Sequence, residues 1–265
     1  MTHKFYYMSD LHIEFASPKF MAISGDNLIL AGDITLLRAL NPRMTDARNR
    51  KLRDRTLTFF NIVRENFKRV FYVTGNHESY GFDINLEAEY IEKYLPGVIH
   101  LNDSSYHLDD STVVLGGTLW TDMNKDDPLA HRAVGAGMND FHYIEMGKDR
   151  FFTKHAYEKH TKTMEFLTTE LEANKHKNCV VVTHHSPTYR GVNPYHGGNH
   201  LDAGYASALD EFIMDRPQVK YWVFGHTHIQ SKFEIGETTL VSNARGYEGY
   251  ESTAATFNPD TYFEV

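Results

Sequence analysis

Short apolar runs and longer amphipathic segments divide this chain into predicted strands and helices. The apolar runs are rich in β-branched and aromatic residues and predict strands over residues 4–8, 27–31, 69–73, 98–101, 112–119, 179–182 and 220–224. Apolar residues at helical spacing predict helices over residues 46–66, 86–94, 153–174 and 206–214. Several strands are almost continuously apolar, which indicates that helices or another sheet cover both of their faces.

Two stretches, residues 120–150 and 187–204, interrupt this pattern with glycines and many polar residues. Long irregular segments of this kind are usually functional lids or mobile surface. The chain shows no internal repeat, low-complexity tract or linker. We therefore expect a single domain over residues 1–265, whose pocket walls come from these two stretches.

Composition narrows the class of protein. The 265 residues are 41% hydrophobic and 13% aromatic, as in a packed globular protein. The net charge of −8 gives no overall attraction to nucleic acid or to an anionic membrane. The one cysteine, Cys179, excludes an internal disulfide, and its apolar strand predicts a buried residue. No signal peptide or membrane-spanning run is visible, so we expect a cytoplasmic protein without a membrane partner.

Polar side chains follow five of the predicted strands, where open α/β folds place their sites. The motifs are Asp10-Leu11-His12, Gly32-Asp33, Gly75-Asn76-His77-Glu78, His184-His185 and Gly225-His226-Thr227-His228. Residues i and i+2 of a strand share a face, so Asp10 and His12 can point at one centre. A single histidine is more often a structural residue than a ligand. The recurrence of the pattern, in a chain with 16 histidines, predicts a shared metal site.

This ordered set, from residue 10 to residue 228, resembles the calcineurin-like metallophosphoesterase superfamily. The resemblance implies an α/β fold: a four-layer α-β-β-α sandwich of two mixed β-sheets flanked by helices, with a dinuclear metal site at the strand C-terminal edges. It also implies the ligands. One metal is held by Asp10, His12 and His228, the other is held by Asn76, His184 and His226, and Asp33 bridges the two.

The residue types suit this chemistry. Imidazole, carboxylate and amide ligands without thiolate favour two divalent ions, for which we expect Mn²⁺, with Fe, Zn²⁺ and Ni²⁺ as alternatives. Four positive charges against the carboxylates of Asp10 and Asp33 leave an excess that suits a phosphate ester. Two such ions can deprotonate a shared water, and the bridging hydroxide would attack phosphorus in line.

Three residues are candidates for substrate binding: Asn76, His77 and His185. The resemblance makes His77 the catalytic group that protonates the leaving alkoxide or supports the phosphoryl oxygens. The alternative is that His77 only hydrogen-bonds to a ligand. His185 either contacts substrate or fills space, and Glu78 is expected to orient its loop. Aromatic and imidazole side chains of the irregular stretches either stack on a base and bind phosphate or pack against the body: Trp120, His142, Tyr143, Tyr189, Tyr195 and His196.

The substrate class is narrowed by two departures from relatives. Protein Ser/Thr phosphatases of the superfamily continue Gly-Asp with a further Asp and an Arg, where this chain has Leu36 and Leu37, which argues against a phosphoprotein. The chain also lacks the length that double-strand-break nucleases use for a capping domain. We expect a phosphodiesterase or phosphatase that acts on a small, nucleotide-sized phosphate ester. The sequence carries no signal for an oligomeric state.

Two alternatives stay open. One is a nuclease for single-stranded nucleic acid, which is not favoured. It would use the basic segment 38–55, whose arginines and lysine otherwise form a solvated helix face or steer an anionic substrate. The other, from a different class, is a catalytically inactive scaffold of the same fold.

Overall fold

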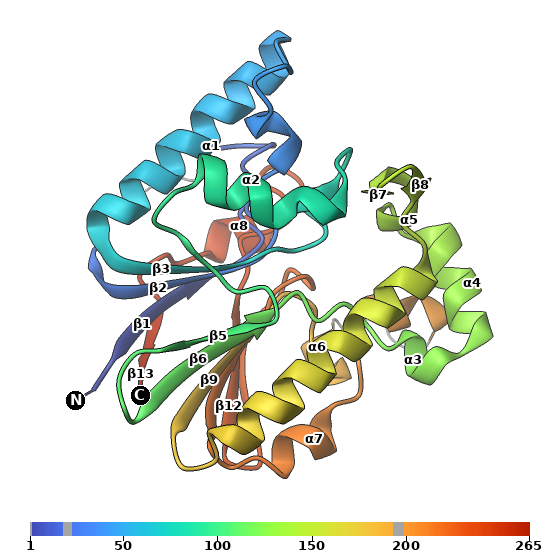
Figure 1. The fold of residues 1–265 in the computed structure, drawn as a ribbon. Helices are drawn as coiled ribbons and strands as arrows, with labels where there is room; N and C mark the ends of the chain where they lie inside the picture. Colours follow the sequence, from blue (N-terminus) through green and yellow to red (C-terminus); the bar gives the residue numbers. More distant parts are fainter. Residues whose placement is uncertain (1, 18–22, 193–198) are drawn as a thin grey trace.

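The structure is a computed structural model that describes residues 2–17, 23–192 and 199–265. Two β-sheets lie face to face at its centre (Figure 1). The first has five strands in the order β13-β1-β2-β3-β4, all parallel except β13. Its strands are β1 (Lys4–Met8), β2 (Gly25–Ala31), β3 (Phe67–Val73), β4 (Ile99–His100) and β13 (Tyr262–Glu264).

The second sheet has six strands in the order β11-β12-β10-β9-β6-β5. Its four inner strands are parallel, and β5 and β11 pair antiparallel at the two edges. Its strands are β5 (Ser104–His107), β6 (Thr112–Gly117), β9 (Asn178–Thr183), β10 (Val219–Val223), β11 (Gln230–Ile235) and β12 (Thr238–Asn243). Both sheets are therefore mixed.

Helices cover the outer face of each sheet. Helices α1 (Ala47–Asn66) and α2 (Glu87–Tyr94) lie over the first sheet, and α6 (Thr153–Ala173) and α7 (Asp210–Met214) lie over the second (Figure 1). A short α8 (Thr253–Thr256) follows β12. This arrangement confirms the predicted four-layer sandwich. No helix in the described part of the chain is long and apolar enough to cross a membrane.

Successive side chains of β2 point alternately into the two cores on either side of the first sheet. Leu28 and Leu30 pack into the core beneath α1 and α2. Ile29 and Ala31 point the other way, into the core between the two sheets, where Val180 and Val182 of β9 also lie. Because both faces are covered there, the last four positions of β2, residues 28–31, are all apolar.

The long helices begin and end close to their predicted positions. Asp46 caps α1, because its side chain accepts a hydrogen bond from the backbone N–H of Asn49 at 3.0 Å. Helices α2 and α6 also match the predicted ranges to within a residue. The last predicted helix is shorter than expected, since α7 starts at Asp210 rather than near residue 206.

The stretch 120–150 is not the irregular loop that the sequence predicts. It contains α3 (Met123–Asp126), α4 (Pro128–Gly137), α5 (Asp140–Tyr143) and a hairpin of β7 (Glu145–Met146) and β8 (Asp149–Arg150). Residues of α3, α4, α5 and β7 share a small core with Trp120 and Phe151, to which Ala156 of α6 also contributes. The apolar stripe of α4 consists of only Ala130 and Val134, too little to show helical periodicity. In the other stretch, short 3₁₀ turns occupy Tyr189–Gly191 and His200–Gly204, and Tyr195 and His196 lie outside the described residues.

Candidate metal centre and active site

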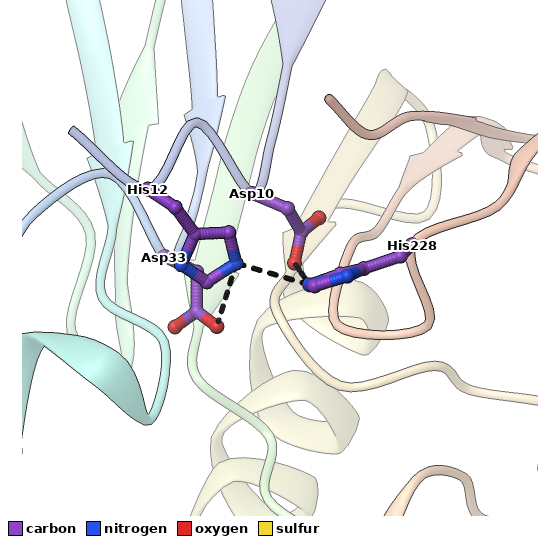
Figure 2. Close-up of side chains that lie close together, drawn as sticks. All are labelled: Asp10, His12, Asp33 and His228. Atoms are coloured by element: carbon purple, nitrogen blue, oxygen red, sulfur yellow. Dashed lines mark hydrogen bonds and ion pairs between the residues drawn. The ribbon is translucent and has the colours of Figure 1, made fainter. Parts of the chain in front are cut away.

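Four side chains from three strand ends point at one another and form the first candidate metal site (Figure 2). Asp10 and His12 follow β1, Asp33 follows β2 and His228 follows β10. His12 Nε2 lies 3.0 Å from His228 Nε2 and 3.8 Å from Asp33 Oδ2. His228 Nε2 lies 3.4 Å from Asp10 Oδ1. One donor atom from each of the four residues falls within 4.8 Å of all the others.

A second group lies on the other side of Asp33. The amide oxygen of Asn76 is 3.0 Å from His184 Nε2 and 3.1 Å from His226 Nδ1. His184 Nε2 is also 3.4 Å from Asp33 Oδ1. Asp33 therefore presents one carboxylate oxygen to His184 and the other to His12, an arrangement that allows it to bridge two ions.

The outer ring nitrogens of the four histidines show that both groups fit metal ions. Each outer nitrogen has a hydrogen-bond acceptor: Glu14 Oε1 at 3.1 Å for His12, Glu251 Oε2 at 2.7 Å for His228, the carbonyl of Ala31 at 2.9 Å for His184 and the carbonyl of Gly204 at 3.3 Å for His226. An acceptor at one ring nitrogen takes the proton there, so the inward nitrogen carries a lone pair. Inward lone pairs and carboxylate oxygens in close contact repel one another unless a cation lies between them.

Electrostatics agree with this interpretation. His184 is fully buried, and burial lowers the pKa of its imidazole. The negative charges of Asp33 and Asp10 nevertheless raise the pKa of His184 to about 10. The carboxylates of Asp33 and Asp10 thus favour a positive charge, a proton or a cation, at Nε2 of His184.

The backbone at five of the seven candidate ligands is in the left-handed region. The φ angles are 53° at Asp10, 45° at His12, 55° at Asp33, 68° at His226 and 52° at His228. Such values cost free energy in non-glycine residues and are typical of functional sites. Close packing adds a further constraint, because a Cβ on Gly75 would lie 2.2 Å from Asp33 Oδ1.

Glu78 holds two of the ligand loops together, as the sequence led us to expect. Its buried carboxylate accepts hydrogen bonds from the backbone N–H groups of Asp33 at 2.9 Å and Gly75 at 2.7 Å. It also accepts from Ile34 N–H and from the Tyr72 hydroxyl, both at 2.7 Å. Burial and the charge of Asp33 raise the pKa of Glu78 to about 7, while these hydrogen bonds oppose the rise.

His77 lies beside the ligands without joining either group around Asp33. Its Nδ1 is 3.0 Å from Glu14 Oε1, and its Nε2 is 3.1 Å from the hydroxyl of Tyr247. Although burial lowers the pKa of His77, Asp33 and Glu14 raise it to about 9. Burial also raises the pKa of Glu14, but the hydrogen bonds from His12 and His77 outweigh burial and lower that pKa to about 2. The carboxylates of Asp33 and Glu14 thus favour the protonated form of His77 at the edge of the site.

A cavity of about 320 Å³ opens over the candidate site. Its described lining includes four carboxylates and no lysine or arginine. These carboxylates belong to Asp33, Asp140, Asp202 and Glu251. Tyr80, Tyr205 and Tyr247 supply the aromatic part of the lining, together with residues of both stretches, 137–140 and 199–202, that were expected to form walls.

The four described members of the aromatic and imidazole set suggested by the sequence are not part of this lining. Trp120 is buried against Phe151 at 4.7 Å between ring centroids, and His142, Tyr143 and Tyr189 are absent from the described lining of the cavity. His185 is also buried, with its ring 4.2 Å from that of His226. Its place behind His226 favours the space-filling alternative over contact with substrate.

Several residues that serve the site were not anticipated. Asp140 accepts hydrogen bonds from Asn76 Nδ2 at 2.7 Å and from the Tyr80 hydroxyl at 2.6 Å, which turns the amide oxygen of Asn76 toward the histidines. Glu14 could have been predicted as a residue of the site, because it follows His12 at the same two-residue spacing that separates His12 from Asp10. Tyr247 and Glu251 lie in a glycine-containing loop after β12 with no recognisable ligand pattern.

Comparisons with known proteins agree with this geometry. The sequence profile of the calcineurin-like phosphoesterase family matches residues 3–230. The chain is 26% identical over 227 residues to the uncharacterized protein L509 of Acanthamoeba polyphaga mimivirus. The alignment covers 78% of this chain and 77% of that protein.

Two solved structures share the fold. One is a phosphopantetheinyl hydrolase from Mycobacterium tuberculosis, with a TM-score of 0.71, 15% sequence identity and coverage of 99% of this chain and 95% of the other. The second is TT1561 of Thermus thermophilus, with a TM-score of 0.50, 15% identity and coverage of 92% and 90%. The match to the family spans most of the sequence and includes all the strand-end motifs. The chain therefore belongs to the calcineurin-like phosphoesterases, and it is a phosphoric ester hydrolase.

Proposed function

We propose that this protein is a two-metal hydrolase that acts on nucleotide-sized phosphate monoesters or diesters. The observation that carries the proposal is the set of four imidazoles whose outer nitrogens are hydrogen-bonded and whose inner nitrogens converge on Asp33. Asp10, His12 and His228 would hold one ion, Asn76, His184 and His226 the other, and Asp33 both. Bound divalent ions would supply Lewis acidity and make water nucleophilic at neutral pH.

The charges of the cavity support a substrate with a single phosphate group. Because the described lining has no lysine or arginine, bound metal ions and a protonated His77 would supply the positive charge for a phosphate there. Asp140, Asp202 and Glu251 would repel the additional phosphates of a di- or triphosphate. A volume of about 320 Å³ suits a group of about the size of a nucleoside.

Nothing in the described cavity supports the nuclease alternative. The basic segment lies on α1 and its lead-in, and none of its residues belongs to the described lining. Arg53 donates its hydrogen bonds to the carbonyls of Ala39, Asn41 and Met44. That arginine stabilises the lead-in loop and is not available to a phosphate backbone.

Hydrolysis assays with defined metals test the proposal. The protein is stripped with EDTA, reloaded separately with Mn²⁺, Fe²⁺, Zn²⁺ or Ni²⁺, and assayed with p-nitrophenyl phosphate and bis-p-nitrophenyl phosphate. We expect metal-dependent turnover and about two bound equivalents. Failure to hydrolyse either ester with any of the four metals would contradict the proposal, and well under one bound equivalent would favour the scaffold.

A substrate screen then separates the remaining classes. It compares mononucleotides, cyclic nucleotides, dinucleotides and short oligonucleotides. It also includes a phosphopantetheinyl ester, because the phosphopantetheinyl hydrolase of Mycobacterium tuberculosis has the same fold. We expect AMP to be hydrolysed faster than ADP or ATP, since the carboxylates of the cavity oppose additional negative charge.

A further inference from the structure

Tyr247 occupies a position in the active site that the family match does not reach. It lies in the loop after β12, beyond the matched residues 3–230. Its side chain lines the cavity, and its ring packs 4.5 Å from that of His12 and 4.6 Å from that of His228, measured between centroids. Tyr247 therefore contacts both histidines proposed for the first metal.

The hydroxyl of Tyr247 also contacts the ring nitrogen of His77 that Glu14 does not contact. Glu14 occupies Nδ1 of that imidazole at 3.0 Å, and the Tyr247 hydroxyl occupies Nε2 at 3.1 Å. Both ring nitrogens of His77 are thus engaged by side chains. Although His77 also lines the cavity, a substrate oxygen could hydrogen-bond to its ring only by displacing Glu14 or the hydroxyl of Tyr247.

The loop that carries Tyr247 is fixed to the first ligand motif. Arg245 N–H donates to the carbonyl of Ser9 at 3.1 Å, and Gly246 N–H donates to the carbonyl of Asp10 at 3.0 Å. The backbone N–H of Tyr247 itself donates to Glu251 Oε2 at 3.0 Å. Because the loop is tied to the same backbone that presents Asp10, the hydroxyl is held at a set place relative to the metal site.

We propose that Tyr247 is a catalytic residue, whose hydroxyl, with His77 behind it, donates the proton to the leaving oxygen of the phosphate ester. This inference rests on the proposed function. The P–O bond to the leaving group breaks with its electron pair on the leaving oxygen, which takes the hydroxyl proton of Tyr247. His77 returns a proton to the tyrosine oxygen, and the proton lost by the attacking water restores His77.

Two esters that differ in their need for this proton provide the test. 4-Nitrophenol leaves readily as an anion, whereas 4-nitrobenzyl alcohol, of nearly the same shape, must be protonated as it leaves. We compare 4-nitrophenyl phosphate with 4-nitrobenzyl phosphate, or the corresponding methyl diesters if the wild type prefers diesters. For Tyr247→Phe we expect kcat to fall about 100-fold or more on the benzyl ester and to stay within about threefold on the phenyl ester.

Controls separate proton donation from packing. The phenylalanine keeps the ring against His12 and His228, so the bound metal should stay at the wild-type level. Tyr250→Phe is the matched control, because Tyr250 lies on the same loop with 81% of its surface exposed, and it should behave as wild type on both esters.

Equal losses on the two esters, or loss of metal in Tyr247→Phe, would overturn the inference and leave the proposed function standing. A wild-type enzyme that hydrolyses only the phenyl ester would also count against it, since no donor would then be at work. A wild type inactive on every ester and metal would remove the proposed function and this inference together.

Discussion

At the scale of single residues, Asp33 and His77 lie close together but have different partners. Asp33 presents one oxygen to His12 and the other to His184, so both groups of candidate ligands depend on it. His77 contacts Asp33 through its backbone N–H, which donates to Oδ1 at 2.9 Å, while its ring is held by Glu14 and Tyr247. Removal of these two side chains should therefore have separable effects.

Substitution by alanine tests this difference. His77→Ala should bind about two equivalents of metal and lose about 10²- to 10⁴-fold in kcat on an ester with a poor leaving group. Asp33→Ala should lose both metal and activity, because no other carboxylate among the described residues faces both groups. Metal analysis after gel filtration, with kcat on the same samples, checks the prediction. If both variants lost metal to the same extent, His77 would have to be counted among the ligands.

The residues that the sequence could predict are those that directly follow a strand. Asp10, Asp33, Asn76 and His226 each lie within a few positions of a strand end, and parallel strands bring such ends to one edge. The partners that orient them could not be found in this way. Asp140 comes from the helical part of the stretch 120–150, away from both central sheets, and only the folded chain brings its carboxylate to Asn76.

At the scale of secondary-structure elements, the basic segment 38–55 contains arginines with two different roles. Arg53 is half-buried and donates hydrogen bonds to three backbone carbonyls of the loop that leads into α1. Arg48 is exposed on the same helix. A run of charge in the sequence does not distinguish these roles, because the carbonyl acceptors belong to a loop whose path is set by tertiary packing.

Arg53→Ala should lower the free energy of unfolding by about 2 kcal/mol, because it leaves several carbonyls without their charged donor. Arg48→Ala should change it by less than about 0.5 kcal/mol, as expected for an exposed side chain. Urea unfolding of both variants at constant metal concentration measures the difference, and kcat/KM should be unaffected in both. A similar loss of stability in the two variants would show that overall charge, and not the capping of the loop, sets the effect.

At the scale of the whole molecule, stability depends on groups buried by the sandwich. His100 lies on β4 at the edge of the first sheet, and its Nε2 is buried without a hydrogen-bond partner among the described residues. Burial lowers the pKa of His100 to about 4. The four layers were implied by the family resemblance that the ordered motifs carry, but a histidine in such a place was not predictable, since its surroundings come from packing.

His100 should make the fold sensitive to mild acid. Between about pH 6.5 and pH 4 the unfolded chain binds a proton at this histidine that the folded chain does not bind, so the free energy of unfolding falls as the pH is lowered. A pKa lowered from 6.5 to about 4 corresponds to a loss of up to about 3 kcal/mol. His100→Leu should remove this part of the pH dependence.

Denaturant unfolding at pH 7, 6, 5 and 4, with metal chelated throughout, measures the effect of His100. His176→Gln is the control, because His176 is exposed. If His100→Leu and the wild type showed parallel profiles over this range, the imidazole would not be desolvated as described.

The candidate ligands come from both halves of the sandwich. Asp10, Asp33 and Asn76 follow strands of the first sheet, and His184 and His226 follow strands of the second. Bound cations would therefore cross-link the two halves of the sandwich at this edge. In a cell starved of metal the halves would be joined there by packing and by hydrogen bonds such as those from His184 to the carbonyl of Ala31 and from His226 N–H to Asp10, so the edge would open more often to proteases. The lifetime of the protein would then follow the supply of its metal.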